Sequence, residues 1–163
     1  MPLEIERRFL VHARRLPSLG EGRRYEQAYL SASPEVRVRL IDGAAAYVTI
    51  KTGSGLIRGE YEYPIPPEDA RELLRLTPWS AIVKTRFKLP LNGLVWEVDH
   101  YEGDNAGLWS AEVEIESEDT AVTLPDWLAQ EVTEEPRFNN VNLAQHPLAT
   151  WPDRDHLLGI VSA

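Results

Sequence analysis

The chain contains no cysteine among its 163 residues. This excludes disulfides, thiolate metal sites and cysteine nucleophiles, and it is consistent with a reducing compartment. No apolar run approaches the roughly 18 residues of a membrane span. Acidic residues begin at Glu4, so the N-terminus lacks the basic and apolar segments of a secretion signal. We therefore expect a cytoplasmic protein with no membrane partner.

Basic residues are also scarce, because 17 lysines and arginines face 26 acidic residues, giving a formal net charge of -9. This balance disfavours nonspecific nucleic-acid binding, and no basic patch with interleaved aromatics is present. Hydrophobic residues at 43% and charged residues at 26% are typical of folded proteins. A mass of 18.5 kDa suits a single domain over residues 1–163. We expect no nucleic-acid partner, and a homodimer is a state that the sequence permits.

Short β-type segments separated by turn residues dominate the first two thirds of the chain. The predicted strands cover residues 3–11, 25–31, 36–41, 46–51, 56–64, 80–89, 93–101 and 108–118. The dipeptides Asp42-Gly43 and Asn92-Gly93 indicate tight hairpin turns. A proline-rich entry predicts a helix over 66–76, and short helices and loops are expected over about 125–163. The fold class is therefore α+β and mainly β.

Charged residues recur at every second position along most of these strands. The pairs are Glu4 with Glu6, Arg37 with Arg39, Glu60 with Glu62, Lys84 with Arg86, Glu97 with Asp99, and Glu112 with Glu114. Alternate residues of a strand share one face. Arg8 extends the first pair, Arg58 precedes the third, and Lys51 follows Thr49 on the same face of its strand. The opposite faces are apolar or aromatic, as in Val36, Val38 and Leu40.

Two architectures fit this alternation. An ordinary half-buried sheet would turn its charged face to water. Repetition over about eight strands favours an eight-stranded antiparallel tunnel barrel with a polar charged lumen and flanking helices. Buried ions without partners would cost several kcal/mol each, so such a lumen must pair them, hydrate them or bind ligands between them.

The chemistry of these side chains indicates the ligand. Arginine and lysine suit phosphate oxygens, and carboxylates suit a hard divalent cation. Both kinds of group in one lumen favour a metal-polyphosphate. An oxygen-rich site that leaves the metal partly hydrated favours Mg²⁺ or Mn²⁺ over zinc.

Nine ordered sequence elements resemble the CYTH family, also called triphosphate tunnel metalloenzymes. The first is the family's E-x-E-x-K, matched by Glu4 and Glu6 with Arg8 in the lysine's place. The others are Q-A-Y-L at 27–30, V-R-V-R at 36–39, T-I-K at 49–51, R-G-E-Y-E at 58–62, K-T-R-F at 84–87, W-E-V-D at 96–99, A-E-V-E at 111–114 and E-V-T-E-E-P-R-F at 131–138. Besides Arg8, the chain departs from the family at Ala28, Phe87 and Phe138, where glycine and tyrosines are usual.

The resemblance, which covers residues 3 to 147, implies a tunnel enzyme that cleaves inorganic triphosphate to pyrophosphate and phosphate with a divalent metal. It implies metal binding by Glu4, Glu6, Glu112 and Glu114, and water activation by Lys84 and Tyr29. The substrate-binding candidates are Arg8, Arg37, Arg39, Lys51, Arg58 and Arg86, and the supporting acids are Glu60, Glu62, Glu97 and Asp99. For each set, ion pairing within the protein is the structural alternative.

Two alternative functions stay open on the same scaffold. One is an adenylate cyclase or a hydrolase of organic triphosphates such as thiamine triphosphate or nucleoside triphosphates. The other is a noncatalytic polyphosphate or nucleotide sensor, which would keep the basic residues but could dispense with the metal and with Lys84.

Overall fold

A computed structural model describes residues 3–163, and its first two thirds are mostly strands. The strands are β1 (Leu3–Val11), β2 (Arg23–Ala32), β3 (Glu35–Ile41), β4 (Ala45–Thr52), β5 (Ile57–Ile65), β6 (Ile82–Leu91), β7 (Leu94–Tyr101), β8 (Trp109–Glu114) and β9 (Leu128–Glu131). They pair in the order β5-β4-β3-β2-β6-β7-β8-β1-β9, and every pairing is antiparallel.

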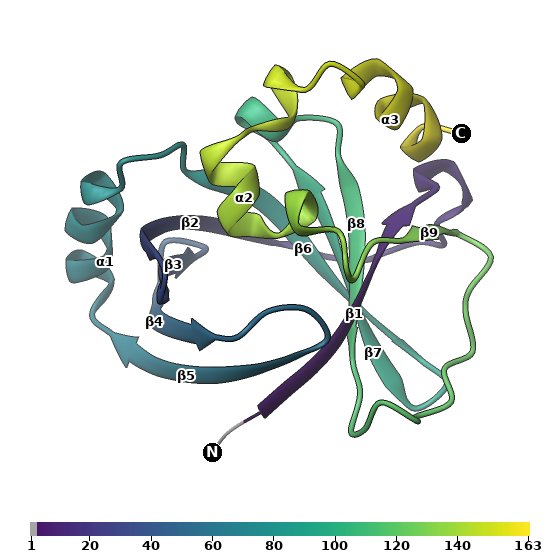
Figure 1. Ribbon diagram of the computed structural model, residues 1–163, viewed down its shortest axis with the longest axis horizontal. Helices are drawn as coiled ribbons and strands as arrows, with labels where there is room; N and C mark the ends of the chain where they lie inside the picture. The colour runs from purple at the N-terminus through teal and green to yellow at the C-terminus, as the bar shows by residue number, and fades with distance from the viewer. Residues whose placement is uncertain (1–2) are drawn as a thin grey trace.

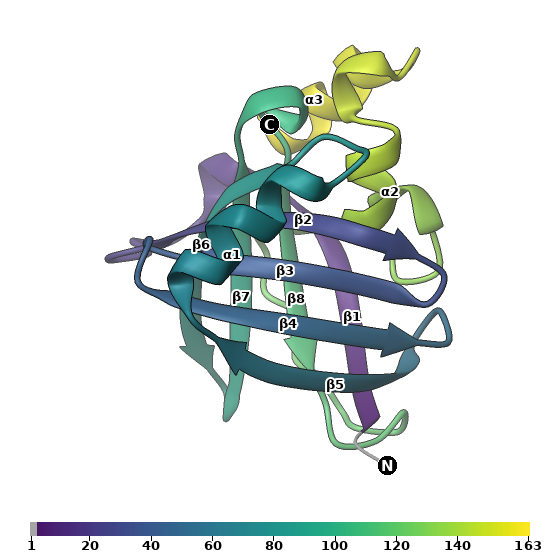
Figure 2. The same cartoon turned by 90° about the vertical axis from the view of Figure 1, so that its left-hand side faces the viewer.

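The first eight strands close on themselves because β1 also pairs with β5, with Leu3 opposite Gly59 and Ile5 opposite Ile57. In Figure 2, β2 to β5 form the near wall and cross in front of β7, β8 and β1. Closure pairs both edges of the sheet and forces alternate side chains to point inward. The predicted fold class is confirmed as a mainly β, closed eight-stranded antiparallel barrel with few helices.

The two predicted hairpin turns are present. Asp42 has a φ of 52° and Gly43 a φ of 66°, and these two residues with Ala44 connect β3 to β4. Asn92 and Gly93 connect β6 to β7 with φ values of 53° and 79°. Glycine and asparagine adopt this left-handed region most readily, so these turns set the register of both hairpins.

The apolar faces of the strands point outward and are covered. Helix α1 (Pro67–Leu73) lies against β3 and β4, where Ala70 packs with Val38 and Leu40 (Figure 1). The outer face of β1, β7 and β8 forms a second core around Trp96, which Trp127 covers. Burial at roughly 25 cal/mol per Å² of apolar surface stabilises this outer shell. The hydrophobic core of this barrel therefore lies outside its lumen.

The C-terminal segment packs across one end of the barrel. It contains α2 (Asn140–Gln145), α3 (Arg154–Val161) and short 3-10 turns at Pro136–Phe138 and Leu148–Thr150. Leu143, Leu157 and Val161 share a buried cluster with Leu10 of β1 and Tyr101 of β7. Figures 1 and 2 show α2 and α3 together at the same end of the barrel. The predicted helical segment thus forms a cap.

Two predictions about the strands were wrong, one about where a strand ends and one about a strand that was not expected. The strand expected over 108–118 ends at Glu114, because the Ser117 N–H bonds to the hydroxyl of Thr120 at 3.1 Å in a turn. The segment expected to hold only helices and loops contains β9, which pairs with β1 through Phe9 and Glu131. Four residues are too few for a clear alternating pattern. Within residues 3–163, none of the helices combines the length and the apolar character that crossing a membrane requires.

Candidate active site

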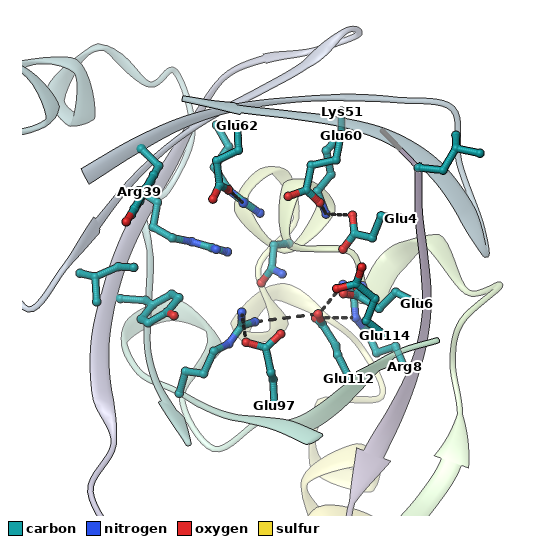
Figure 3. Close-up of a pocket in the computed structure, with 17 residues that line it drawn as sticks. Glu4, Glu6, Arg8, Arg39, Lys51, Glu60, Glu62, Glu97, Glu112 and Glu114 are labelled. Atoms are coloured by element: carbon teal, nitrogen blue, oxygen red, sulfur yellow. Dashed lines mark hydrogen bonds and ion pairs between the residues drawn. The ribbon is translucent and has the colours of Figure 1, made fainter. Parts of the chain in front are cut away.

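The inward-facing charged residues line a cavity of about 440 Å³ inside the barrel. Its wall includes Glu4, Glu6, Arg8, Arg37, Arg39, Lys51, Glu60, Glu62, Arg86, Glu97, Glu112 and Glu114. These residues come from seven strands, and Figure 3 shows ten of them around the cavity with a helical segment behind. Side chains far apart in sequence therefore meet in one enclosed space, as the two-residue spacing predicted.

Four of the sequence-predicted site residues do not line this cavity. Arg58 borders a neighbouring cavity of about 30 Å³, and its Nη2 donates to Oε2 of Glu35 at 2.8 Å. Lys84 and Asp99 have fully buried side chains, and Tyr29 is 1% exposed. These four lie within or behind the wall.

Carboxylates gather on one side of the cavity. Glu4, Glu6, Glu112 and Glu114 project from β1 and β8, and Figure 3 shows them close together. Burial and the negative charges of Glu112 and Glu4 raise the pKa of Glu6 well above its usual range. This side of the site carries more negative charge than its own cations neutralise.

Glu4, Glu60 and Lys51 form a separate contact on the same side. The Nζ of Lys51 lies 2.9 Å from Oε2 of Glu4 and 3.7 Å from Oε2 of Glu60. A hydrogen bond with Glu4, followed by burial, raises the pKa of Glu60 to about 7. Burial opposes ionisation of Glu4, but the same hydrogen bond and the charge of Lys51 lower its pKa to about 2. Near neutral pH Glu4 is therefore ionised and Glu60 is partly protonated.

Arg37, Arg39 and Arg86 also line the cavity, and Nη2 of Arg86 lies 3.9 Å from Oε2 of Glu112. The Nη2 of Arg37 donates to the hydroxyl of Thr49 at 3.2 Å and lies 3.7 Å from Glu62. Arg39 donates through Nε to Oε1 of Gln27 at 2.9 Å, and no carboxylate lies within salt-bridge distance of it in residues 3–163. Figure 3 shows the Arg39 guanidinium reaching toward the centre of the cavity. Burial and the charges of Arg37 and Arg86 lower the pKa of Arg39 to about 10, which leaves it cationic near neutral pH.

Arg8 joins the barrel wall to its C-terminal cap. Its Nε and Nη2 donate to Oε1 of Glu112 at 3.1 and 2.9 Å. Its Nη1 donates to the carbonyl of Phe138 and to Oδ1 of Asn139, both at 2.9 Å. The planar fork uses most of its five donors within the protein, and a lysine could not make these contacts together. Arg8 is therefore a structural anchor at the edge of the cavity.

Lys84 and Asp99 are buried behind the wall, where they form a cluster with the wall residue Arg86. The Nζ of Lys84 donates to Oδ2 of Asp99 at 2.7 Å, and Arg86 binds both Asp99 oxygens at 2.8 and 2.9 Å. Burial lowers the pKa of Lys84 to about 7, with the charge of Arg86 acting in the same direction and that of Asp99 opposing it. Arg86 also lies 3.2 Å from Glu97 and 3.9 Å from Glu112, whereas Asp99 is the carboxylate that Lys84 contacts directly.

Tyr29 lies at the capped end of β2. Its hydroxyl accepts a hydrogen bond from Nε2 of Gln27 at 3.4 Å, and its carbonyl accepts one from the hydroxyl of Thr77 at 2.9 Å. Burial raises its pKa to about 12. In residues 3–163 no hydrogen bond or salt bridge joins it to Lys84, so the structure does not bring the two predicted catalytic residues into direct contact.

Sequence reasoning missed three polar residues of the wall, namely Tyr25, Tyr47 and Asn140. Tyr25 shares its inward face with Gln27 and Tyr29, so its parity on β2 could have indicated it. Asn140 begins α2 and accepts a hydrogen bond from the Tyr101 hydroxyl at 2.7 Å. No periodicity in the sequence indicates that a cap residue reaches the lumen.

The donor atoms fit a divalent metal that keeps water and substrate oxygens in its coordination shell. Oε2 of Glu4 is buried and accepts no hydrogen bond, since Lys51 approaches it outside hydrogen-bond geometry. The crowded carboxylates of Glu6, Glu112 and Glu114 supply only oxygen. Over residues 3–163 no three acidic or histidine side chains are grouped so that they could hold a metal ion by themselves. Mg²⁺ binds in this open manner, through one or two carboxylates plus phosphate and water.

The fold is a closed antiparallel barrel with charged residues lining its cavity, and comparison with known proteins identifies the family. The CYTH domain model matches residues 2–146, so the chain belongs to the CYTH family. Membership implies a divalent metal cofactor.

Two curated relatives carry the same name. The chain is 40% identical over 157 residues to the inorganic triphosphatase of Acetivibrio thermocellus, covering 94% of this chain and 100% of the relative. It is 36% identical over 152 residues to the inorganic triphosphatase of Nitrosomonas europaea, covering 86% and 96%. The crystal structure of the inorganic triphosphatase NE1496 superposes with a TM-score of 0.65 at 34% identity, covering 88% of this chain and 95% of that one.

Proposed function

We propose that this chain hydrolyses inorganic triphosphate to pyrophosphate and orthophosphate inside the barrel, with Mg²⁺ or Mn²⁺. The observation that carries the proposal is the cavity in which Arg37, Arg39 and Arg86 face a cluster of carboxylates. Its volume of about 440 Å³ is at the small end of ligand pockets, which suits a compact anion. The two relatives named inorganic triphosphatase support the same substrate.

The arginines and Lys51 would bind the substrate's phosphate oxygens. Water would attack the terminal phosphorus, forming one P–O bond while the phosphoanhydride P–O bond breaks and pyrophosphate leaves. Charge spreads over the phosphoryl oxygens in such a transition state, and preorganised guanidinium groups stabilise it in place of water. Arg8 and Arg58, whose donors engage Glu112 and Glu35, would act mainly by orienting the wall.

The carboxylates of Glu4, Glu6, Glu112 and Glu114 would hold the metal. When bound, a divalent ion neutralises phosphate charge and orients the substrate. Glu60, Glu62, Glu97 and Asp99 would keep the cations in place when no substrate is present, because each contacts a lysine or arginine. A substrate whose phosphate oxygens bind these lysines and arginines would replace the carboxylates in their ion pairs.

Water activation by Lys84 and Tyr29 stays a prediction. The pKa of Lys84 near 7 supports a base that loses its proton at neutral pH. Its fully buried position behind Arg86 requires that the proton reach it through the Asp99 cluster or through a change of rotamer. Lys51 is the lysine on the cavity wall, and its ammonium is the one that can contact a bound phosphate directly.

The test is phosphate release from inorganic triphosphate, ATP and thiamine triphosphate, each with Mg²⁺, with Mn²⁺ and with chelator. We expect metal-dependent release, fastest on inorganic triphosphate. Faster turnover of an organic triphosphate, or formation of cyclic AMP, would assign the alternative enzymes. Tight triphosphate binding without turnover would assign the sensor.

The number of domains, the cellular location and the oligomeric state also stay predictions. Residues 1–163 would form one domain, since the C-terminal cap shares its core with β1 and β7. A cytoplasmic location would be checked by cell fractionation. A homodimer would be checked by light scattering.

A further inference from the structure

Tyr25 lies between two of the proposed phosphate-binding cations. The guanidinium carbon of Arg39 is 4.8 Å from the centre of its ring, and that of Arg86 is 5.0 Å from the same centre. Both distances are within the range of cation–π attraction. Tyr25 is 6% exposed, lines the cavity and projects from β2, between β3 and β6, which carry the two arginines.

The two arginines differ in how the protein holds them. Arg86 is fixed by the two-pronged contact with Asp99 and by Glu97 at 3.2 Å. Arg39 has one hydrogen bond, to the neutral side chain of Gln27, and no carboxylate partner in the described part of the chain. Like-charged neighbours oppose its ionised form, since Arg37 and Arg86 both lower the pKa of Arg39. The ring of Tyr25, whose centre is 4.8 Å from the guanidinium carbon, attracts this cation.

We infer that Tyr25 is a positioning residue whose ring holds Arg39 beside the already fixed Arg86, so that the Arg39 guanidinium is ready for a triphosphate. The inference rests on the proposed function for its substrate. The negative face of an aromatic ring attracts a guanidinium without neutralising it. A carboxylate in this position would occupy the donors that the phosphate needs. An aromatic ring orients Arg39 and leaves its donors free.

The decisive variants are Tyr25→Leu and Tyr25→Phe. Tyr25→Leu removes the ring, so Arg39 loses its orientation, and we expect KM for triphosphate to rise about tenfold while kcat changes less. Tyr25→Phe keeps the ring, so KM should stay within about threefold of the wild type. Tyr63→Leu, at a tyrosine that is 56% exposed on β5, is the matched control and should leave both constants unchanged.

A second readout is independent of turnover. Calorimetric binding of triphosphate in the presence of chelator should weaken about tenfold in Tyr25→Leu. A double-mutant cycle with Arg39→Met tests the coupling. In the Arg39→Met background, Tyr25→Leu should weaken triphosphate binding by no more than about threefold, because the guanidinium that the ring positions is absent. If Tyr25→Leu does not fold, Tyr25→Met replaces it, since Met fills the space without an aromatic face.

Three results would overturn the inference. One is equal loss in Tyr25→Phe and Tyr25→Leu, which would assign the effect to the hydroxyl. Another is an unchanged KM and binding constant in Tyr25→Leu. The third is that the losses of triphosphate binding caused by Tyr25→Leu and Arg39→Met are fully additive in the double variant. A wild-type chain that binds triphosphate without hydrolysing it would refute the proposed function, while the binding measurements would still decide the role of Tyr25.

Discussion

Whether the buried side chain of Lys84 stays protonated depends on the charged groups around it. It shares Asp99 with Arg86, so the three side chains carry a net positive charge when all are ionised. Burial of such a charge is costly in a medium of low dielectric constant. Arginine keeps its proton far more strongly than lysine, so Lys84 is the group that gives it up. A lysine whose pKa lies near 7 can gain or lose a proton at the pH of the cell.

Lys84→Met should remove a pH dependence of stability. The pKa of Lys84 falls from an ordinary 10.5 to about 7 on folding, so between these values the unfolded chain binds a proton that the folded chain has released. The free energy of unfolding should therefore rise with pH from 7 toward 10.5, and the penalty is complete below 7. Between pH 7 and 9, urea unfolding should show wild-type stability rising by about 2 kcal/mol relative to Lys84→Met.

A constant difference between these proteins across that range would mean that Asp99 keeps Lys84 charged. The same variant tests the catalytic role. If Lys84 is the base, kcat should fall much more than triphosphate binding, and equal loss of both would remove the base from the mechanism.

At the scale of elements, the barrel and its cap meet through β1. Arg8 extends from β1 to Glu112 on β8 and to the turn that starts α2. The pairing of β1 with β5 closes the barrel, so this strand carries both the closure and the cap contact. Arginine in place of the family's lysine is explained by this bridge, which needs donors in two directions.

Arg8→Lys should loosen the cap. A lysine keeps the charge near Glu112 but loses the fork that also binds the Phe138 carbonyl and Asn139, and we expect a loss of about 1–2 kcal/mol. For a chain of this size the melting temperature should fall by roughly 3–6 °C. Asn139→Ala removes one of these contacts and should cause a smaller fall. Melting curves that coincide with the wild type would show that the bridge contributes nothing.

At the scale of the whole molecule, the apolar shell lies outside the strands and the charges lie inside. Seven glutamates line this lumen with four arginines and one lysine, and several of these carboxylates repel one another when no metal is bound. A ligand that neutralises them binds only the folded barrel. The whole barrel should therefore gain stability from the metal by mass action.

Thermal unfolding should be a single transition that Mn²⁺ or Mg²⁺ moves upward. Glu114 tests the metal site cleanly, because it lines the cavity without an ion pair in the described residues, and burial and the charges of Glu4 and Glu97 raise its pKa. Glu114→Gln should leave the metal-free melting temperature unchanged or slightly higher. Its half-saturating metal concentration should rise about tenfold. The control is Glu116→Gln, at an exposed acid beyond the end of β8, and an equal effect there would refute a specific metal role.

The local sequence determined the hairpins and the alternation of charged and apolar positions, and the repetition of this alternation favoured a barrel over an open sheet. Turn residues such as Asn92 and Gly93 act within a few residues, and the two-residue period of a strand places Glu4, Glu6 and Arg8 on one face without reference to the rest of the chain.

Only the tertiary structure decided which inward side chains reach the open cavity and which become buried within the wall. Lys84 and Arg86 share one face of β6, yet the first is sealed behind Asp99 and the second lines the cavity. How deep a side chain lies inside a barrel depends on the stagger of the strands and on the segment that caps the barrel. Both bring together residues more than a hundred positions apart, such as Arg8 and Phe138. The position of Tyr25 against Arg39 and Arg86 has the same origin, because three strands must pair before its ring meets both cations.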